Sequence, residues 1–417
     1  MIAKVTRKNE FRRMTAPLLK NKWAVQWVSV MLVLLMVGLL LSRALVSLSS
    51  VLIVVPFFFH RQIDQRTRVL LVAVLLMLLP VIISGFWSEN HALWWNSVVV
   101  KIPLVTMLLG IGSVHFSAER KTKLIYLYLL FISLGCIWSF SHYLLDPTTI
   151  QAAYLQAKTL PTPADNDHIR FSWMVVIAVI LGFYSWRTTQ TKTTRYLLAA
   201  CLVLLVVYLH VLAAKTGLVC LYAGSGMYII YLIIVQKKWK PGLLLLAVCA
   251  VAAFACYQTM PTLRNRVQYV LYDFSNYSSG KILPGYSDAS RWLSIKAGYQ
   301  LTAQHPFAGV GFGDMLSAIE QWHQLNHPSS LAYERFLPAN EWLVYGTGSG
   351  LPGVLCFTAG FVLLLYRTTS RNIFSVIVTT ISLIPFLFDD TLEGQTGILI
   401  LAFIAFFGQQ KLSSIHV

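Results

Sequence analysis

Residues 24–42 read AVQWVSVMLVLLMVGLLLS, an apolar run of the length that a helix needs to cross the hydrocarbon core of a bilayer. Comparable runs recur along all 417 residues, of which 57% are hydrophobic and only 12% are charged. A soluble protein of this length could not bury so much apolar surface. The sequence therefore predicts an all-α, polytopic integral membrane protein.

The apolar runs predict about twelve transmembrane helices. Their expected positions are 24–42, 44–59, 69–86, 97–113, 123–144, 171–186, 196–214, 216–236, 241–257, 342–366, 372–388 and 394–409. Three parts follow from this pattern: a membrane bundle with spans one to nine (1–257), a large polar loop domain (258–341), and spans ten to twelve with a tail (342–417). We expect two or three amphipathic helices on the membrane surface in the loop domain.

The positive charges orient the predicted spans. Alternate connections and the two termini carry 22 of the chain's 33 Lys and Arg residues and only three acidic residues. Because cytoplasmic loops are enriched in Lys and Arg, both termini should be cytoplasmic and the 258–341 loop should be periplasmic. The net charge of +17 is thus a topology signal. It does not indicate nucleic-acid binding, which would need basic and aromatic residues on one soluble face.

The most polar stretch of the chain runs from 287 to 353 and contains three candidate elements. Ser287-Asp288-Ala289-Ser290-Arg291-Trp292 predicts a helix with an acidic, hydroxyl-rich first turn. His305-Pro306 is followed by glycines at every second position, which permits a tight turn and a close approach to something bulky. Asn340-Glu341 then leads into a glycine-rich span.

Several charged residues lie in or beside predicted spans. Lys215 has almost no loop around it, so it either faces a partner or substrate inside the bundle or extends to the outer headgroups. For Lys101 and Arg43, snorkelling or helix packing is the favoured interpretation. For Asp389 and Asp390, the favoured interpretation is a solvated loop, with a base or metal pair as the alternative.

We expect neither a metal nor a cofactor. The six cysteines show no paired spacing, which argues against disulfides and a zinc site. The glycines after His305 lack the Lys and Ser/Thr of a phosphate-binding loop, and no strand precedes them, so a nucleotide site is not expected either.

The order of these features resembles the O-antigen ligase and polymerase superfamily of bacterial inner-membrane glycosyltransferases. The resemblance rests on the large loop between spans nine and ten, Arg-Trp in a Ser/Asp-rich helix, His-Pro-x-x-Gly-x-Gly, and Asn-x-x-Leu entering a glycine-rich span. It implies a fold like that of all-helical glycosyltransferases that use lipid-linked sugars. It also implies a polyprenyl-pyrophosphate-linked glycan as donor, with no nucleotide sugar and no metal.

The resemblance also implies roles for particular residues. Lys215 and Arg291 match the two cations that grip the pyrophosphate, although lysine offers a point charge where arginine offers a fork. Arg170, at the end of the other long outward connection, is a third candidate for binding phosphate. The supporting candidates are His168, Asn340 and Asp288.

The family's loop histidine, thought to be the general base, is absent here. Pro338 and Ala339 precede Asn340, where the family has that histidine. Glu341 is the first candidate to replace it and His305 the second, with His327 and His168 as further possibilities. Helix-dipole stabilisation accounts equally well for a glutamate in a first turn.

The predicted function is transfer of a glycan from polyprenyl (undecaprenyl) pyrophosphate to an acceptor on the periplasmic face of the bacterial inner membrane. The favoured acceptor is lipid A-core, which would make the reaction O-antigen ligation in lipopolysaccharide synthesis; a chain polymerase acting on another lipid-linked glycan is the alternative. A polysaccharide or lipid transporter would show inverted repeats, which we do not find. A scaffold role also stays open because the histidine is missing.

Overall fold

The computed structural model describes residues 22–60, 63–156, 158–163, 166–278, 287–368, 373–394 and 397. These residues form helices and turns, with no strand among them. Nine helical segments of the described chain are long and apolar enough to cross a membrane. They are built on α2 (Lys22–Leu41), α5 (Gln65–Ile83), α6 (His91–Gly112), α7 (Ala118–Leu145), α9 (His168–Thr188), α10 (Lys192–Leu212), α11 (Lys215–Ile230), α12 (Trp239–Thr259) and α16 (Glu341–Thr368). The prediction of an all-α polytopic membrane protein is confirmed.

Two further predicted spans are broken into shorter helices. The 44–59 run forms α3 (Arg43–Leu52) and α4 (Val55–His60), and the 372–388 run forms α17 (Ile373–Ile381) and α18 (Ile384–Phe388). Pro56 and Pro385 lie near the starts of α4 and α18, where the missing N–H of proline prevents the preceding helix from continuing. The predicted span 394–409 lies outside the described residues, except for positions 394 and 397.

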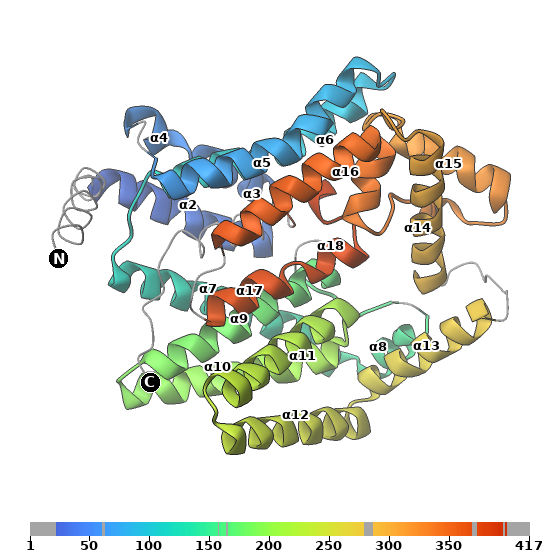
Figure 1. The fold of residues 1–417 in the computed structure, drawn as a ribbon. Coiled ribbons are helices and arrows are strands. Elements are labelled where there is room, and N and C mark those ends of the chain that lie inside the picture. The colour runs from blue at the N-terminus through green and yellow to red at the C-terminus, as the bar shows by residue number, and fades with distance from the viewer. Residues whose placement is uncertain are drawn as a thin grey trace.

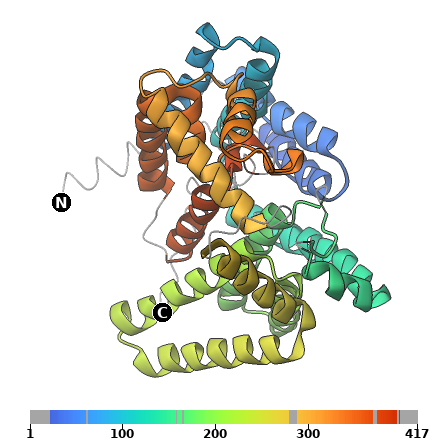
Figure 2. The same cartoon turned by 90° about the vertical axis from the view of Figure 1, so that its right-hand side faces the viewer.

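The long helices run side by side in two groups (Figure 1). One group contains α5, α6 and α16, and the other contains α9 to α12, with α17 and α18 between them. Two 3₁₀ turns, η1 (Ser84–Phe86) and η4 (Thr391–Glu393), follow α5 and α18. Figure 2, seen from the side, shows α14 (Ser287–Gln304) crossing from one group to the other. We call this end of the molecule, where α9, α11 and α16 begin, the α14 end.

The large loop forms three helices: α13 (Pro261–Ser278), α14 and α15 (Met315–Asn326), followed by the short turn η3 (Ala332–Glu334). Trp322 of α15 is buried and donates its indole N–H to Gln300 Oε1 of α14, at 2.6 Å. α14 itself packs along the start of α16. The loop helices therefore rest on the ends of the membrane helices and do not form a separate body.

The glycine series after His305 packs against a kink in α16. Gly350 has a φ of +66°, which interrupts the helix and leaves the carbonyl of Thr347 to accept the N–H of Val310, at 2.8 Å. A Cβ on Gly309 would lie 2.4 Å from the backbone nitrogen of Ser349. The close approach that the glycines permit is therefore to the protein's own backbone.

Candidate functional site

Cationic side chains gather at the α14 end because several helices begin there. Arg170 lies in the first turn of α9 and Lys215 is the first residue of α11. The α10–α11 turn is very short, because Ala213 adopts left-handed geometry (φ +47°) and reverses the chain at once. Arg291 lies in the second turn of α14, which crosses these helix starts. The three predicted phosphate-binding residues are thus on elements that meet at one end of the bundle.

Lys215 forms an ion pair with Asp288, the supporting residue predicted on α14. The Nζ atom of Lys215 lies 2.5 Å from Asp288 Oδ1, and both side chains are more than one-third exposed. The backbone N–H of Asp288 donates to Asp273 Oδ2 on α13, at 3.1 Å. Burial raises the pKa of the Asp273 carboxyl, and the hydrogen bond from Asp288 partly offsets this. One carboxylate therefore links the starts of α11 and α14.

Arg170 and Arg291 meet at Asp389. Asp389 Oδ2 lies 3.7 Å from Arg170 Nη2, and Oδ1 lies 3.7 Å from Arg291 Nη1. Arg291 also donates to the carbonyl of Phe388, at 2.6 Å, and Arg170 to the carbonyl of Asp390, at 3.1 Å. The interpretation of Asp389 and Asp390 as a solvated loop was wrong, because the side chains of both residues contact arginines from other helices.

Asp390 and Asp167 complete the surroundings of Arg170. Asp167 Oδ2 accepts a hydrogen bond from Arg170 Nη1 at 2.8 Å, and Asp390 Oδ1 lies 3.5 Å from Nη2. Burial, with the neighbouring charge of Asp389, raises the pKa of Asp390 to about 8, although Arg170 opposes the shift. Asp390 therefore keeps its proton at neutral pH, which leaves more of the arginine charge uncompensated.

A pair of buried charges anchors this acidic loop to the bundle. Lys101 of α6 is fully buried and donates to Glu393 Oε1 at 2.6 Å. Glu341 Oε2 accepts the backbone N–H of Leu392, at 3.1 Å. Because Lys101 is buried inside the protein, the snorkelling interpretation was wrong, and the residue takes part in the helix packing. The physical reason is that Glu393 supplies a partner inside the bundle.

The three candidates for the general base, Glu341, His305 and His168, differ in burial and in their position in the fold. Glu341 is fully buried, and its Oε1 has no hydrogen-bond partner in the described structure. His305 is exposed at the far end of α14, about 20 Å along the helix from Arg291. His168, the first residue of α9, lies at the α14 end, two residues before Arg170. His305 is thus not brought together with the cations, whereas His168 is.

Asn340 has a capping role in the structure. Its Oδ1 accepts the N–H of Leu343 in the first turn of α16, at 3.2 Å, and its Nδ2 donates to the carbonyl of Leu387, at 3.2 Å. It therefore joins the start of α16 to the end of α18, just before the carboxylates that hold the two arginines.

Arg266 of α13 is a member of the cluster that the sequence did not single out. It is 6% exposed, and its guanidinium carbon lies 5.2 Å from the ring centre of Tyr154 in α8 (Pro147–Tyr154) and 5.8 Å from that of Tyr269. Lys215 Nζ lies 5.8 Å from the same Tyr269 ring. Arg266 donates to the carbonyl of Lys158, at 3.4 Å, while its Nε has no hydrogen-bond partner in the described structure.

No carboxylate of the described residues forms an ion pair with Arg266, which separates it from the other three cations. Burial lowers the pKa of its guanidinium, yet an arginine stays charged at any ordinary pH. A buried charge without a counter-ion is costly, and a bound anion would remove that cost. The spacing of Arg266 and Tyr269, three residues apart on one helix face, was the signal in the sequence.

The arrangement suits an anion held at the edge of an apolar bundle. Four cations lie at this end of the bundle, and the described residues contain no group of three His, Cys, Asp or Glu side chains that could hold a metal ion. Lys215 and Arg291 remain partly exposed, so oxygen atoms of a ligand can replace the carboxylates that now pair with them.

Comparison with protein families identifies residues 200–358 with the O-antigen ligase family. The matched segment contains Lys215, Arg266, Asp288 and Arg291, whereas Arg170 and Asp389 lie outside it. The match confirms the resemblance predicted from the motifs, and with the apolar helices it indicates a bacterial membrane protein. No curated protein matches the sequence.

Proposed function

We propose, from the match of residues 200–358 to the O-antigen ligase family, that this protein moves a glycan from polyprenyl pyrophosphate to an acceptor at the periplasmic face of the inner membrane. Lipid A-core is the acceptor we favour, which makes the reaction the ligation step of lipopolysaccharide synthesis. Growth of a lipid-linked chain by polymerisation is the alternative within the same chemistry. The α14 end is then the periplasmic end, with both termini on the cytoplasmic side.

The observation that carries the proposal is the cationic cluster itself. When the acceptor hydroxyl attacks the anomeric carbon, the sugar–phosphate bond breaks and negative charge develops on the departing pyrophosphate. Lys215, Arg291 and Arg170 are positioned to stabilise that charge. Arg266, already desolvated, would interact strongly with a phosphate oxygen that reaches it.

The carboxylates of the cluster then act as temporary partners for the cations. Asp288 and Asp389 hold Lys215, Arg170 and Arg291 in place before the donor binds. Phosphate oxygens accept the same charge-assisted hydrogen bonds, so the exchange conserves the number of contacts. The proton retained by Asp390 supports this exchange, because an ionised Asp390 would repel the incoming phosphates.

The position of His168 supports it as the group that takes the proton from the acceptor hydroxyl. General-base catalysis needs a side chain within hydrogen-bond reach of the attacking oxygen. Glu341 is fully buried and bonded to the backbone of Leu392, and His305 is at the wrong end of α14. Glu341 and His305 thus remain candidates for the general base, and we favour His168 over both.

The test is the glycan profile of a strain that lacks the gene, complemented with variants of matched expression. Wild type should restore long chains on lipid A-core, Arg291→Ala should not, and Lys296→Ala should, since Lys296 is an exposed cation of the same helix. Lipid-linked polymer should accumulate in the deletion strain. Capping with a single repeat would instead indicate the polymerase, and an unchanged glycan profile would overturn both assignments.

A further inference from the structure

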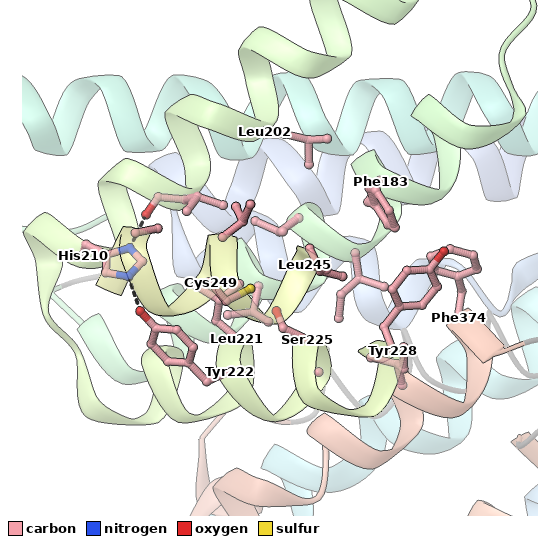
Figure 3. Close-up of a pocket in the computed structure, with 18 residues that line it drawn as sticks. Phe183, Leu202, His210, Leu221, Tyr222, Ser225, Tyr228, Leu245, Cys249 and Phe374 are labelled. Atoms are coloured by element: carbon pink, nitrogen blue, oxygen red, sulfur yellow. Dashed lines mark hydrogen bonds between the residues drawn. The ribbon is translucent and has the colours of Figure 1, made fainter. Parts of the chain in front are cut away.

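An apolar pocket of about 300 Å³ lies inside the second helix group, away from the cationic cluster (Figure 3). Side chains from five helices, α9, α10, α11, α12 and α17, line it. Hydrocarbon and aromatic groups make up most of the lining, among them Phe183, Leu202, Leu221, Tyr228, Leu245 and Phe374. A pocket of this character favours an apolar ligand.

The two most polar residues of the lining, His210 and Tyr222, are hydrogen-bonded to each other. His210 Nδ1 lies 2.8 Å from the carbonyl of Val206, and its Nε2 lies 2.6 Å from the hydroxyl of Tyr222. With Nδ1–H donating to the carbonyl, Nε2 accepts the hydrogen bond from the hydroxyl of Tyr222. The pair therefore lies at one end of the pocket (Figure 3) and leaves neither ring nitrogen of His210 without a partner.

The α12 wall of the pocket is the part of the bundle that is packed least tightly. Among the residues of α12 only Gly242 is buried, and Figures 1 and 2 show this helix at the edge of the molecule. Leu245, Val248 and Ala252 of α12 line the pocket, and Val248 and Ala252 are themselves exposed, as is their neighbour Leu244. A chain that entered from the bilayer beside α12 would displace few contacts.

Helix α11 connects this pocket to the cationic cluster. Lys215 is its first residue, and the first lining residue, Leu221, follows six residues later, which is about 9 Å along the axis. The last, Tyr228, lies about 20 Å along the axis from Lys215. A headgroup held by Lys215 would therefore carry its tail along α11 toward the Tyr222 end of the pocket.

We propose that this pocket holds the first part of the polyisoprenoid chain of the donor, an inference that rests on the function proposed above. The occupant follows from the continuity along α11: a lipid whose charged head is a pyrophosphate can fill both places at once. An acyl chain of a membrane phospholipid would meet the same apolar lining but would not depend on the cations.

The inference is tested by the binding of two probes to the purified full-length protein in nanodiscs. Geranylgeranyl pyrophosphate carries both headgroup and isoprenoid chain, and inorganic pyrophosphate carries the headgroup alone. Ala252→Phe fills the pocket from α12, and Ala255→Phe, three residues further on the same helix, is exposed and outside the lining. Val248→Trp is a second filling variant, and the melting temperature checks the folding of each.

Wild type should bind geranylgeranyl pyrophosphate more tightly than pyrophosphate. Each filling variant should weaken the binding of the isoprenoid probe by about tenfold, because buried hydrocarbon contact is lost. The binding of pyrophosphate should stay unchanged. Ala255→Phe should bind both probes as wild type does. Equal binding of the isoprenoid probe by wild type and both filling variants would overturn the pocket assignment alone. Failure of wild type to bind either probe would overturn the proposed function itself.

Discussion

The ammonium group of Lys215 lies 2.5 Å from both carboxylate oxygens of Asp288, so one ion pair joins the first turns of α11 and α14. Both side chains remain more than one-third exposed. An exposed pair of this kind contributes at most about 1 kcal/mol to stability. It can therefore be exchanged for a phosphate at little cost, which is what a donor site requires.

The two partly exposed cations should matter for transfer and not for folding. We expect Lys215→Ala and Arg291→Ala each to lower the transfer rate by roughly 10- to 100-fold, the loss of a charge-assisted hydrogen bond. Lys215→Arg should retain activity, because arginine also binds phosphate. Transfer assays in membranes, with expression matched, measure this, and Lys296→Ala is the control. Full activity of both alanine variants would end the pyrophosphate assignment.

Replacement of Arg266 should maintain or raise the stability of the protein while it weakens donor binding. Arg266→Met keeps much of the side-chain bulk between Tyr154 and Tyr269 but removes a buried charge that forms no ion pair with a described carboxylate. We expect the melting temperature to stay the same or rise, because the desolvation cost disappears, while donor binding weakens by roughly tenfold. A lower melting temperature together with unchanged donor binding would show that Arg266 is a packing residue only.

The buried pair of Lys101 and Glu393 should be a large contributor to stability when only one partner is removed. Lys101→Met leaves Glu393 buried without its partner and should destabilise the protein by about 3–5 kcal/mol. Combining it with Glu393→Leu should recover most of that loss. Thermal unfolding in detergent measures both. The control is Lys123→Ala, since Lys123 pairs with Glu119 at an exposed site, where we expect the melting temperature to stay unchanged.

Variants of His168, His305 and Glu341 distinguish the three candidates for the general base. His168→Ala should lower transfer by about 10²- to 10⁴-fold, as expected for loss of a positioned base, without weakening donor binding. His305→Ala and Glu341→Gln should keep most of the activity, because His305 lies at the other end of α14 and Glu341 is fully buried and bonded to the backbone of Leu392. Single-turnover rates as a function of pH make the comparison. A rate loss confined to Glu341→Gln, with a changed pH profile, would restore Glu341 as the base.

The raised pKa of Asp390 predicts a pH-dependent stability. In the folded protein Asp390 keeps its proton up to about pH 8, whereas in the unfolded chain it ionises near its ordinary value of 3.8. Stability from this group is therefore greatest at low pH and falls as the pH rises from about 4 to about 8. Asp390→Asn should flatten that slope and raise the melting temperature at pH 8. The control is Glu320→Gln at an exposed position; equal slopes in wild type and Asp390→Asn would contradict the assignment.

The sequence by itself determined the membrane class and most of the helix positions. A run such as 24–42 must become a helix if it enters a bilayer, because no water is present there to satisfy its backbone groups. Hydrophobic length is a local property, so it can be read without knowing which helices touch. The breaks near Pro56 and Pro385 were also local, but the apolar runs around them concealed the shortening.

Only the tertiary structure decided how the charges are paired. Arg170 and Arg291 share Asp389 across long stretches of sequence, and Lys101 meets Glu393 from a different helix. Whether an acidic loop is solvated or neutralised depends on which helix ends pack beside it, and spacing along the chain does not record that. The same holds for Arg266, whose burial between two tyrosines arises where α8 meets α13, because desolvation is a property of the packed helices and not of the residue.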